Sequence, residues 1–120
     1  MKRLFLTAVT ASLLSSAFLI SVPAAQAEEA AYNLVLLRHG ESQWNLEKRF
    51  TGWSDIDLTD KGRAGAVKAG EIMKGAGVNF DEVHTSKLNR AIETAQLAQK
   101  GMSAQWVPLQ KFWRLNERCY

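Results

Sequence analysis

The chain has 120 residues, of which 47% are hydrophobic and 22% charged, and this composition is that of a globular protein rather than a disordered or collagen-like one. Its length limits it to one domain. The formal net charge is only +3, and it falls to +1 when the two basic residues at the extreme N-terminus are set aside. A net charge this small does not predict a broad basic face, so we expect no nucleic acid partner.

Residues 1–27 have the pattern of a secretory signal peptide. Two basic residues open the chain, residues 4–22 carry no charge, and Ala25-Gln26-Ala27 is a small-x-small cleavage site. An uncleaved membrane anchor is the alternative, because a spanning helix needs about 20 apolar residues. A proline and several hydroxyl residues dilute the stretch and favour cleavage. We predict an exported protein, periplasmic or secreted, with one partial domain over residues 28–120. We expect it to associate with a membrane only through the signal peptide.

The first element predicted in this domain is a strand at Leu34–Leu37. Its unbroken apolar run is typical of a strand that is buried on both faces of a parallel sheet. A helix is predicted next, with Thr59 as its N-cap, Lys74 as its last residue and Gly75 as the stop signal. The side chains expected to face inward from this helix are Ala66, Ala69, Ile72 and Met73.

A second strand is predicted over residues 80–85, where β-branched and aromatic residues occur, followed by a second helix capped by Ser86. The apolar face of this helix is expected to be Leu88, Ala91, Ile92, Ala95 and Ala98. A third strand is predicted over residues 105–109, with Pro108 at its end or on a sheet edge. The order of strands and helices predicts an α/β fold with parallel strands and right-handed crossovers.

Charged residues follow each of the three predicted strands. His39 comes directly after the first strand, Arg90 lies beyond the second, and Glu117 and Arg118 lie beyond the third. Because ligands of α/β folds bind at the carboxyl ends of the strands, we expect these side chains to meet at one edge.

The residues Arg38, His39 and Gly40 favour phosphoryl transfer at that edge. A neutral imidazole nitrogen can attack phosphorus when a hydrogen bond holds the other ring nitrogen. Gly40 allows close approach of the backbone to a phosphate, and a guanidinium such as that of Arg38 matches phosphate oxygens. Arg90 and Arg118 could stabilise the charge that spreads over the transferred group, and Glu117 could move a proton. We expect no metal site, because His39, His84 and Cys119 are not spaced as zinc ligands are.

Several motifs occur in series after the predicted first strand. They are Arg-His-Gly-Glu-Ser-Gln-Trp-Asn at 38–45, Arg-Phe-Thr-Gly-Trp at 49–53, Leu-Thr at 58–59, Thr-Ser at 85–86 with Arg-Ala at 90–91, and Leu-Asn-Glu-Arg at 115–118. This series resembles the 2,3-bisphosphoglycerate-dependent phosphoglycerate mutases of the histidine phosphatase superfamily, from Leu34 to Tyr120. The first four residues alone indicate only the superfamily, which includes acid phosphatases and bisphosphatases. The mutase branch is indicated by Ser-Gln-Trp-Asn, Phe-Thr-Gly-Trp and Leu-Asn-Glu-Arg.

The resemblance implies a fold, a reaction and a set of site residues. The fold would be the N-terminal part of a three-layer α/β structure with a parallel sheet. The reaction would interconvert 3-phosphoglycerate and 2-phosphoglycerate, as in glycolysis and gluconeogenesis, through a phosphohistidine at His39 with Glu117 as general acid and base. The histidine would be primed by 2,3-bisphosphoglycerate, with no permanently bound cofactor and no metal. The implied substrate-binding residues are Arg38, His39, Gly40, Glu41, Ser42, Gln43, Trp44, Asn45, Thr51, Gly52, Arg90, Glu117, Arg118 and Tyr120.

The sequence departs from the family pattern in two respects. Cys119 stands where the family has a histidine, and the sequence stops at Tyr120, before a lysine, an arginine pair and a second histidine that the family supplies. Since losing one preorganised charge stabiliser typically costs about 100- to 1000-fold in rate, we expect little or no activity from the chain as written. The apolar strand Leu34–Leu37 would also lack a neighbour, so we expect instability, self-association or a homo-oligomer.

Three interpretations of function therefore stay open. A mutase fits the later motifs, although the family is cytoplasmic and this chain carries an export signal. An exported histidine phosphatase-like hydrolase fits the export signal, with water taking the phosphoryl group and a small phosphorylated molecule as substrate. An inactive truncated fragment fits the missing second histidine.

Overall fold

The computed structural model describes residues 32–119 of the chain. The chain divides into two compact units, Met1–Leu34 and Val35–Tyr120, which are described separately. In the first unit the described residues, 32–34, are exposed coil, and the predicted signal peptide lies outside the described residues. No helix in residues 32–119 has the length and apolar character needed to cross a membrane.

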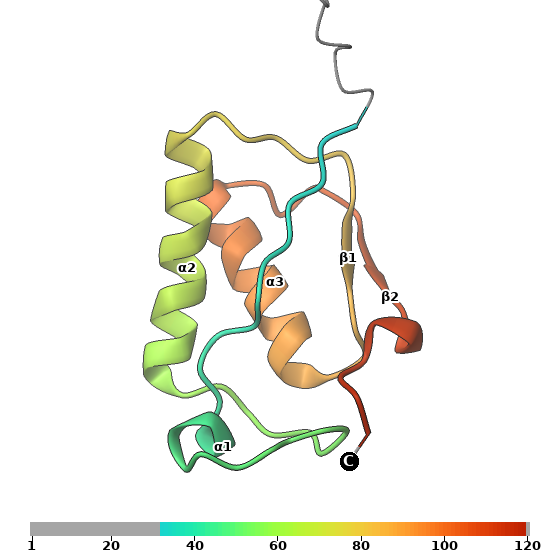
Figure 1. The fold of residues 1–120 in the computed structure, drawn as a ribbon. Helices are drawn as coiled ribbons and strands as arrows, with labels where there is room; N and C mark the ends of the chain where they lie inside the picture. Colours follow the sequence, from blue (N-terminus) through green and yellow to red (C-terminus); the bar gives the residue numbers. More distant parts are fainter. Residues whose placement is uncertain (1–31, 120) are drawn as a thin grey trace, which may run out of the picture. The chain divides into compact units, whose positions relative to one another are not determined.

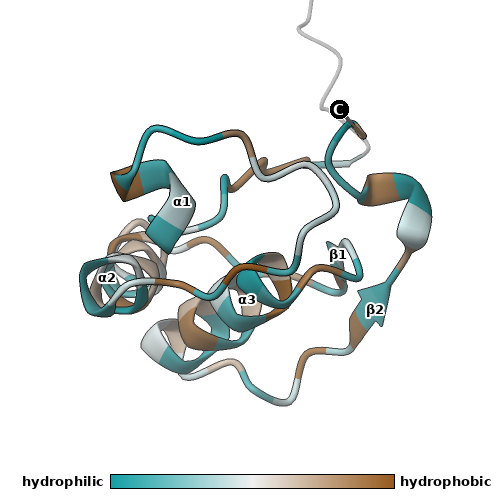
Figure 2. Cartoon of the chain, turned by 90° about the horizontal axis from the view of Figure 1, so that it is seen from below, coloured by the Kyte–Doolittle hydropathy of each residue, from teal (hydrophilic) through white to brown (hydrophobic). Residues whose placement is uncertain are grey.

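The second unit combines helices with a pair of parallel strands (Figure 1). Its elements are α1 (Gln43–Leu46), α2 (Asp60–Gly75), β1 (Val83–Thr85), α3 (Asn89–Met102), β2 (Leu109–Lys111) and the 3₁₀ helix η1 (Trp113–Leu115). Helix α3 lies between α2 and the two strands, as Figures 1 and 2 both show. The strands pair in register from Val83 opposite Leu109 to Thr85 opposite Lys111. The predicted α/β class with parallel strands is confirmed.

Helix α2 begins where the sequence predicts. The Thr59 hydroxyl accepts a hydrogen bond from the Gly62 N–H at 3.0 Å, which satisfies one of the free donors of the first turn. The helix ends at Gly75, one residue later than predicted, and the chain then turns through Gly77 with a φ of 72°. This left-handed conformation favours glycine and completes the helix end.

Helices α2 and α3 approach each other along a seam of small residues. A Cβ added to Gly70 would lie 2.1 Å from the carbonyl oxygen of Ala98, and one added to Gly101 would lie 2.2 Å from that of Val67. The predicted inward position of Ala66 is confirmed, because Ala66 is buried. The predicted inward position of Ile72 is wrong, because Ile72 is 61% exposed. Ile72 is two residues beyond Gly70, and a helix turns roughly 200° over two residues, so it faces away from the seam.

The predicted strand at Leu34–Leu37 is not formed. These residues are coil, and Leu36 is 86% exposed while Val35 and Leu37 are about half that. The alternation shows an extended chain with one partly covered side, but no strand within residues 32–119 pairs with it. A strand that is buried on both faces needs neighbouring strands to pair with and layers that cover it. The local sequence could not show that residues 32–119 contain no strand paired with this segment.

Two local predictions near α3 need correction. The helix N-cap is Leu88 rather than Ser86, and the Asn89 N–H instead donates to the Asp55 carboxylate at 2.7 Å. The third strand, predicted at 105–109, begins only at Leu109, directly after Pro108, whose carbonyl accepts from the Val83 N–H. Proline has no N–H for a sheet ladder, so it stands at the strand's start, in agreement with a strand-end position.

Candidate active site

The ring of His39 is held in one tautomer by its own neighbour in the chain. Its Nδ1 lies 2.7 Å from the carbonyl oxygen of Gly40, and the ring is half-buried. A carbonyl oxygen can only accept, so Nδ1 carries a proton, and in the neutral ring the lone pair is then on Nε2. The geometry thus prepares Nε2 as a nucleophile, which is the arrangement that phosphoryl transfer to histidine requires.

The backbone after His39 is fixed against both long helices. The Gly40 N–H donates to the Thr94 hydroxyl at 2.9 Å, and that hydroxyl donates to the Arg90 carbonyl at 2.6 Å. A Cβ at Gly40 would lie 2.6 Å from the carbonyl oxygen of Gly62 in the first turn of α2. Gly40 is therefore needed for this packing, in addition to the approach to phosphate that the sequence suggested.

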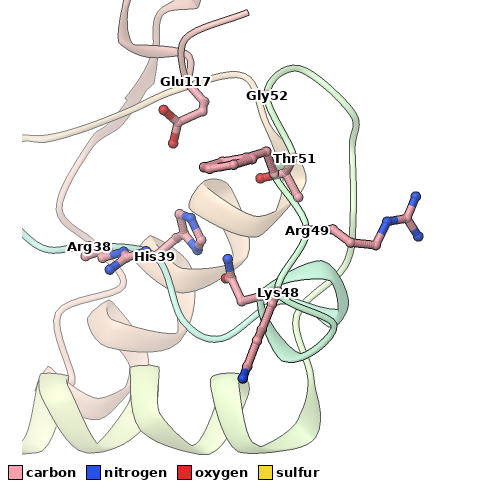
Figure 3. Close-up of a pocket in the computed structure, with 9 residues that line it drawn as sticks. Arg38, His39, Lys48, Arg49, Thr51, Gly52 and Glu117 are labelled. Carbon is pink, nitrogen blue, oxygen red and sulfur yellow. The ribbon is translucent and has the colours of Figure 1, made fainter. Parts of the chain in front are cut away.

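His39 lines a basic pocket of about 340 Å³. The lining residues are Arg38, His39, Asn45, Lys48, Arg49, Phe50, Thr51, Gly52 and Glu117. Figure 3 shows the Glu117 carboxylate facing the His39 ring across the pocket, with Arg38 beside the ring, while the Arg49 side chain points away. A guanidinium beside the imidazole and an acid that faces it suit a phosphomonoester, because the cation attracts its charge and the acid can move a proton.

Glu117 is held at the pocket by contacts to its backbone and to its carboxylate. The Trp53 indole N–H donates to the Glu117 carbonyl oxygen at 2.6 Å, and the Arg118 N–H donates to Glu117 Oε1 at 3.1 Å. Nearby, the Asn116 side chain accepts from the Lys87 N–H at 2.9 Å. These contacts join the C-terminal part of the described chain to the loop 51–55 and to the start of α3.

Arg90 contacts the loop that borders the pocket but is not among the lining residues. It is 1% exposed, and its guanidinium donates to the carbonyl oxygens of Gly52 and Ser54, each at 2.9 Å. Burial lowers the pKa of Arg90, an effect that the charges of Glu117 and Asp55 oppose. Its Nε is buried and has no hydrogen-bond partner among residues 32–119. In this structure Arg90 fixes the loop that borders the pocket.

The structure brings six of the sequence-predicted site residues to one pocket and places the others elsewhere. Those in the pocket are Arg38, His39, Asn45, Thr51, Gly52 and Glu117. Trp44 lines an adjoining pocket, and Gly40, Glu41, Ser42, Gln43, Arg90 and Arg118 line neither. Tyr120 lies outside the described residues.

The predicted residues of the 41–43 segment support the fold around the site. The Glu41 carboxylate accepts from the Thr59 hydroxyl at 3.0 Å and pairs with Lys61 at 3.4 Å. Ser42 is fully buried and caps α1, accepting from the Asn45 N–H. Gln43 is exposed on α1, and its N–H donates to the Asp57 carbonyl. The side-chain contacts of Glu41 and Ser42 thus account for these two residues without a ligand, whereas the contact of Gln43 is made by its backbone.

Three pocket residues were not among the predicted site residues. Lys48, Arg49 and Phe50 follow α1 and lead into the loop 51–55. Lys48 adopts a φ of 56°, and the Arg49 guanidinium lies 3.9 Å from the centre of the Trp44 ring. Arg49 and Phe50 lie inside the 49–53 motif, so their position beside two predicted residues was the available signal.

Among residues 32–119, no group of three or more His, Cys, Asp or Glu side chains is arranged to hold a metal ion. The ionisable residues that line the pocket are His39, three basic residues and Glu117.

Known proteins resemble both the sequence and the fold. A family model of the histidine phosphatase superfamily (branch 1) matches residues 34–120. A 2,3-bisphosphoglycerate-dependent phosphoglycerate mutase from Bacteroides fragilis is 56% identical over 87 residues, which are 72% of this chain and 35% of the relative. The chain thus spans about a third of the length of the curated relatives it matches.

Two solved structures agree with this relation. A phosphoglycerate mutase from Bacillus anthracis str. Sterne matches with a TM-score of 0.62 and 33% identity, covering 66% of this chain and 34% of that one. A putative alpha-ribazole-5'-P phosphatase from Escherichia coli matches with a TM-score of 0.60 and 36% identity, over 68% of this chain and 37% of that one. The mutase resemblance of the motifs is confirmed, and the chain belongs to branch 1 of the histidine phosphatase superfamily.

Proposed function

We propose that this phosphoglycerate mutase-like chain accepts a phosphoryl group on Nε2 of His39 and interconverts 3-phosphoglycerate and 2-phosphoglycerate. The observation that carries the proposal is the 2.7 Å hydrogen bond from His39 Nδ1 to the Gly40 carbonyl, which makes Nε2 the lone-pair nitrogen of the neutral ring in a basic pocket. The 56% identity to a curated mutase favours this reaction over others of the superfamily. Because the chain spans about a third of that relative, the whole reaction is a proposal.

The proposed chemistry begins with 2,3-bisphosphoglycerate, which primes the protein. Nε2 of His39 attacks one phosphorus, the ester P–O bond breaks as the N–P bond forms, and protonated Glu117 gives its proton to the leaving oxygen. In the next step the phosphoryl group passes from His39 to the free hydroxyl of a monophosphoglycerate, and Glu117 takes up the hydroxyl proton. Transfer of the other phosphoryl group back to His39 completes the isomerisation. No metal or permanently bound cofactor takes part in this scheme.

The pocket residues have separable parts in this scheme. Arg38 lies beside the imidazole and supplies positive charge for the transferred group, while Asn45 and Thr51 offer hydrogen bonds at the pocket wall. Arg90 holds the Gly52 and Ser54 carbonyls and thereby keeps the wall in place. The cationic lining suits a small phosphorylated substrate, and the near-neutral composition gives no reason to expect nucleic acid.

A labelling experiment tests the proposal. The full chain is incubated with 2,3-bisphosphoglycerate labelled with ³²P, quenched with alkali, and analysed for acid-labile phosphate on His39. We expect label on the wild type and none on His39→Ala, with conversion of 3-phosphoglycerate to 2-phosphoglycerate lost in the same variant. Glu117→Gln should still fold and should form phosphohistidine more slowly, because the leaving oxygen then lacks its acid. Equal labelling of the wild type and His39→Ala would refute the proposal.

The second candidate is an exported hydrolase, in which water takes the phosphoryl group from His39. Its support is the signal-like segment at residues 1–27, since glycolytic intermediates are cytoplasmic, and a solved relative that is named a putative phosphatase. Release of labelled inorganic phosphate without isomerised product would favour it. Absence of any label on His39 would instead favour an inactive fragment. Fractionation of the producing cells, with a tag at the C-terminus, tests the proposed export.

A further inference from the structure

Thr94 joins the segment of the nucleophile to helix α3. Its hydroxyl accepts a hydrogen bond from the Gly40 N–H at 2.9 Å, across 54 positions of sequence, and donates one to the Arg90 carbonyl at 2.6 Å. A hydroxyl has one donor and two acceptor sites, so both bonds can form at the same time. Threonine often bonds the carbonyl four residues back in its own helix, but the bond from Gly40 is not local. This second bond connects the chain after His39 to the helix.

Thr94 shares one face of α3 with Arg90. The two residues are four positions apart, which places them on the same side of a helix, and they are 3% and 1% exposed. Arg90 holds the loop 51–55 through its guanidinium, and Thr94 holds Gly40 through its hydroxyl. The first turns of α3 therefore fix two segments of the chain, around His39 and in the loop 51–55, that both line the basic pocket.

Gly40 needs a contact of this kind because its own backbone is permissive. Glycine has no Cβ and adopts many more backbone conformations than other residues. The Gly40 carbonyl accepts the hydrogen bond from His39 Nδ1 at 2.7 Å, so a rotation of Gly40 would release the ring. The Gly62 carbonyl limits Gly40 on one side, because a Cβ there would lie 2.6 Å from it. The bond to Thr94 holds the Gly40 N–H.

We propose that Thr94 is a positioning residue, whose hydroxyl holds the Gly40 backbone so that the Gly40 carbonyl keeps the His39 ring in the Nδ1–H tautomer. Thr94 lines neither pocket, and it acts on the ring only through Gly40. The consequence for catalysis rests on the proposed phosphoryl acceptance at Nε2, whereas the effect on the ring does not. Valine at this position keeps nearly the shape of threonine but cannot accept from the Gly40 N–H, and serine keeps the hydroxyl.

The tautomer of His39 is the direct readout. The chain contains two histidines, and the exposed one is removed by His84→Gln, which serves as the parent chain. A long-range ¹H–¹⁵N NMR spectrum of the neutral ring distinguishes a protonated from an unprotonated nitrogen. We expect the Nδ1–H form to predominate in the parent. Thr94→Val should lower the ratio of Nδ1–H to Nε2–H by about five- to tenfold, the factor that matches the usual net value of one hydrogen bond, and Thr94→Ser should keep it.

Thr85→Val is the matched control. Thr85 is also buried, at 7% exposed, but it lies on β1, and the hydrogen bonds of Gly40 and His39 do not include it. This variant should leave the tautomer ratio unchanged. A ratio in Thr94→Val equal to that of the parent would overturn the proposal. An equal loss in Thr85→Val would also overturn it, because the effect would then follow from removing any buried hydroxyl.

Amide exchange in the parent chain decides the matter if Thr94→Val fails to fold. Relative to an unstructured peptide, the Gly40 N–H should exchange about tenfold more slowly than the Leu36 N–H, because Leu36 lies in exposed coil. Equal protection of the two amides would show that the bond to Thr94 does not hold Gly40.

Failure of this proposal differs from failure of the phosphoryl-transfer function. A tautomer ratio that responds to Thr94→Val, without any ³²P label on His39, supports the positioning role and refutes the reaction. Label on His39 with a ratio that does not respond refutes the positioning role alone. If both proposals hold, the initial rate of labelling should fall in Thr94→Val by the same factor as the ratio and should recover in Thr94→Ser.

Discussion

The indole N–H of Trp53 donates to the carbonyl oxygen of Glu117 across 64 positions of sequence, at 2.6 Å. Trp53 belongs to a loop whose Gly52 and Ser54 carbonyls accept hydrogen bonds from the Arg90 guanidinium. The proposed acid is thus connected through an indole and a buried guanidinium to helix α3. Its position over His39 depends on residues that do not themselves react.

Trp53→Phe should weaken this connection while keeping an aromatic ring in place. We expect loss of about 0.5–1.5 kcal/mol in the free energy of unfolding, the usual net value of one hydrogen bond. Urea unfolding followed by far-ultraviolet circular dichroism measures the change. Trp106→Phe is the control and should leave the midpoint unchanged, because Trp106 lies exposed beyond α3. Equal midpoints for Trp53→Phe and the wild type would mean that the contact contributes nothing in solution.

A pair of glycine variants tests the seam between α2 and α3. Gly70→Ala should destabilise the fold by about 1–3 kcal/mol, because its Cβ would collide with the Ala98 carbonyl 2.1 Å away. Gly65→Ala, in the same helix with nothing within 4 Å, should stabilise it by about 0.5–1 kcal/mol. Thermal unfolding of the two variants should therefore shift in opposite directions. Stabilisation by both would show that the helices are not in close contact.

Arg90→Lys tests whether this buried residue acts through the loop. A lysine ammonium lacks the planar fork that reaches the Gly52 and Ser54 carbonyls together. We expect a loss of about 1.5–3 kcal/mol, the value of one hydrogen bond to a charged group. Arg114→Lys, at an exposed site in η1, is the control. Chemical denaturation compares them, and an identical loss in the two variants would argue against a special role for Arg90.

Leu36→Lys tests the expected self-association of the chain. Leu36 is 86% exposed between two half-exposed apolar residues, in an extended segment without a paired strand within residues 32–119. An unpaired apolar edge favours association, and a lysine there opposes it. Sedimentation velocity should show concentration-dependent assemblies for the wild type and a smaller share for the variant. Leu46→Lys, at an exposed position of α1, should leave the assemblies unchanged. A wild type that is monomeric at all concentrations would contradict the expectation.

Local signals in the sequence predicted the parts of the fold that depend on neighbouring residues. Thr59 caps α2 through a residue three positions away, and the stop after Gly75 is likewise a local feature. Two of the predictions that failed depend on distant groups. The cap of α3 comes from Asp55, 34 positions from the residue it binds, and the burial of Leu34–Leu37 depends on pairing partners that lie outside any local pattern.

The candidate site follows the same division. His39 and Glu117 were predicted to meet because parallel strands end at one edge of a sheet, and both do line one pocket, although the segment before His39 is coil. Arg90 could be singled out as a cation near that edge, but only the fold shows that its guanidinium donates to two backbone carbonyls of the loop 51–55. The adjoining pocket that Trp44 lines was not predicted, because its residues come from the 44–54 segment and from Cys119, which no spacing connects.

Gly40 and Gly62 lie at the same close backbone contact, although 22 positions separate them in the sequence. A Cβ on Gly40 would strike the Gly62 carbonyl, and one on Gly62 would lie 2.2 Å from the Glu41 carbonyl. A larger residue at either position would have to push the nucleophile's loop off α2, so neither can be enlarged without moving His39. Engineering of this pocket should therefore leave both glycines untouched and vary its outer wall instead.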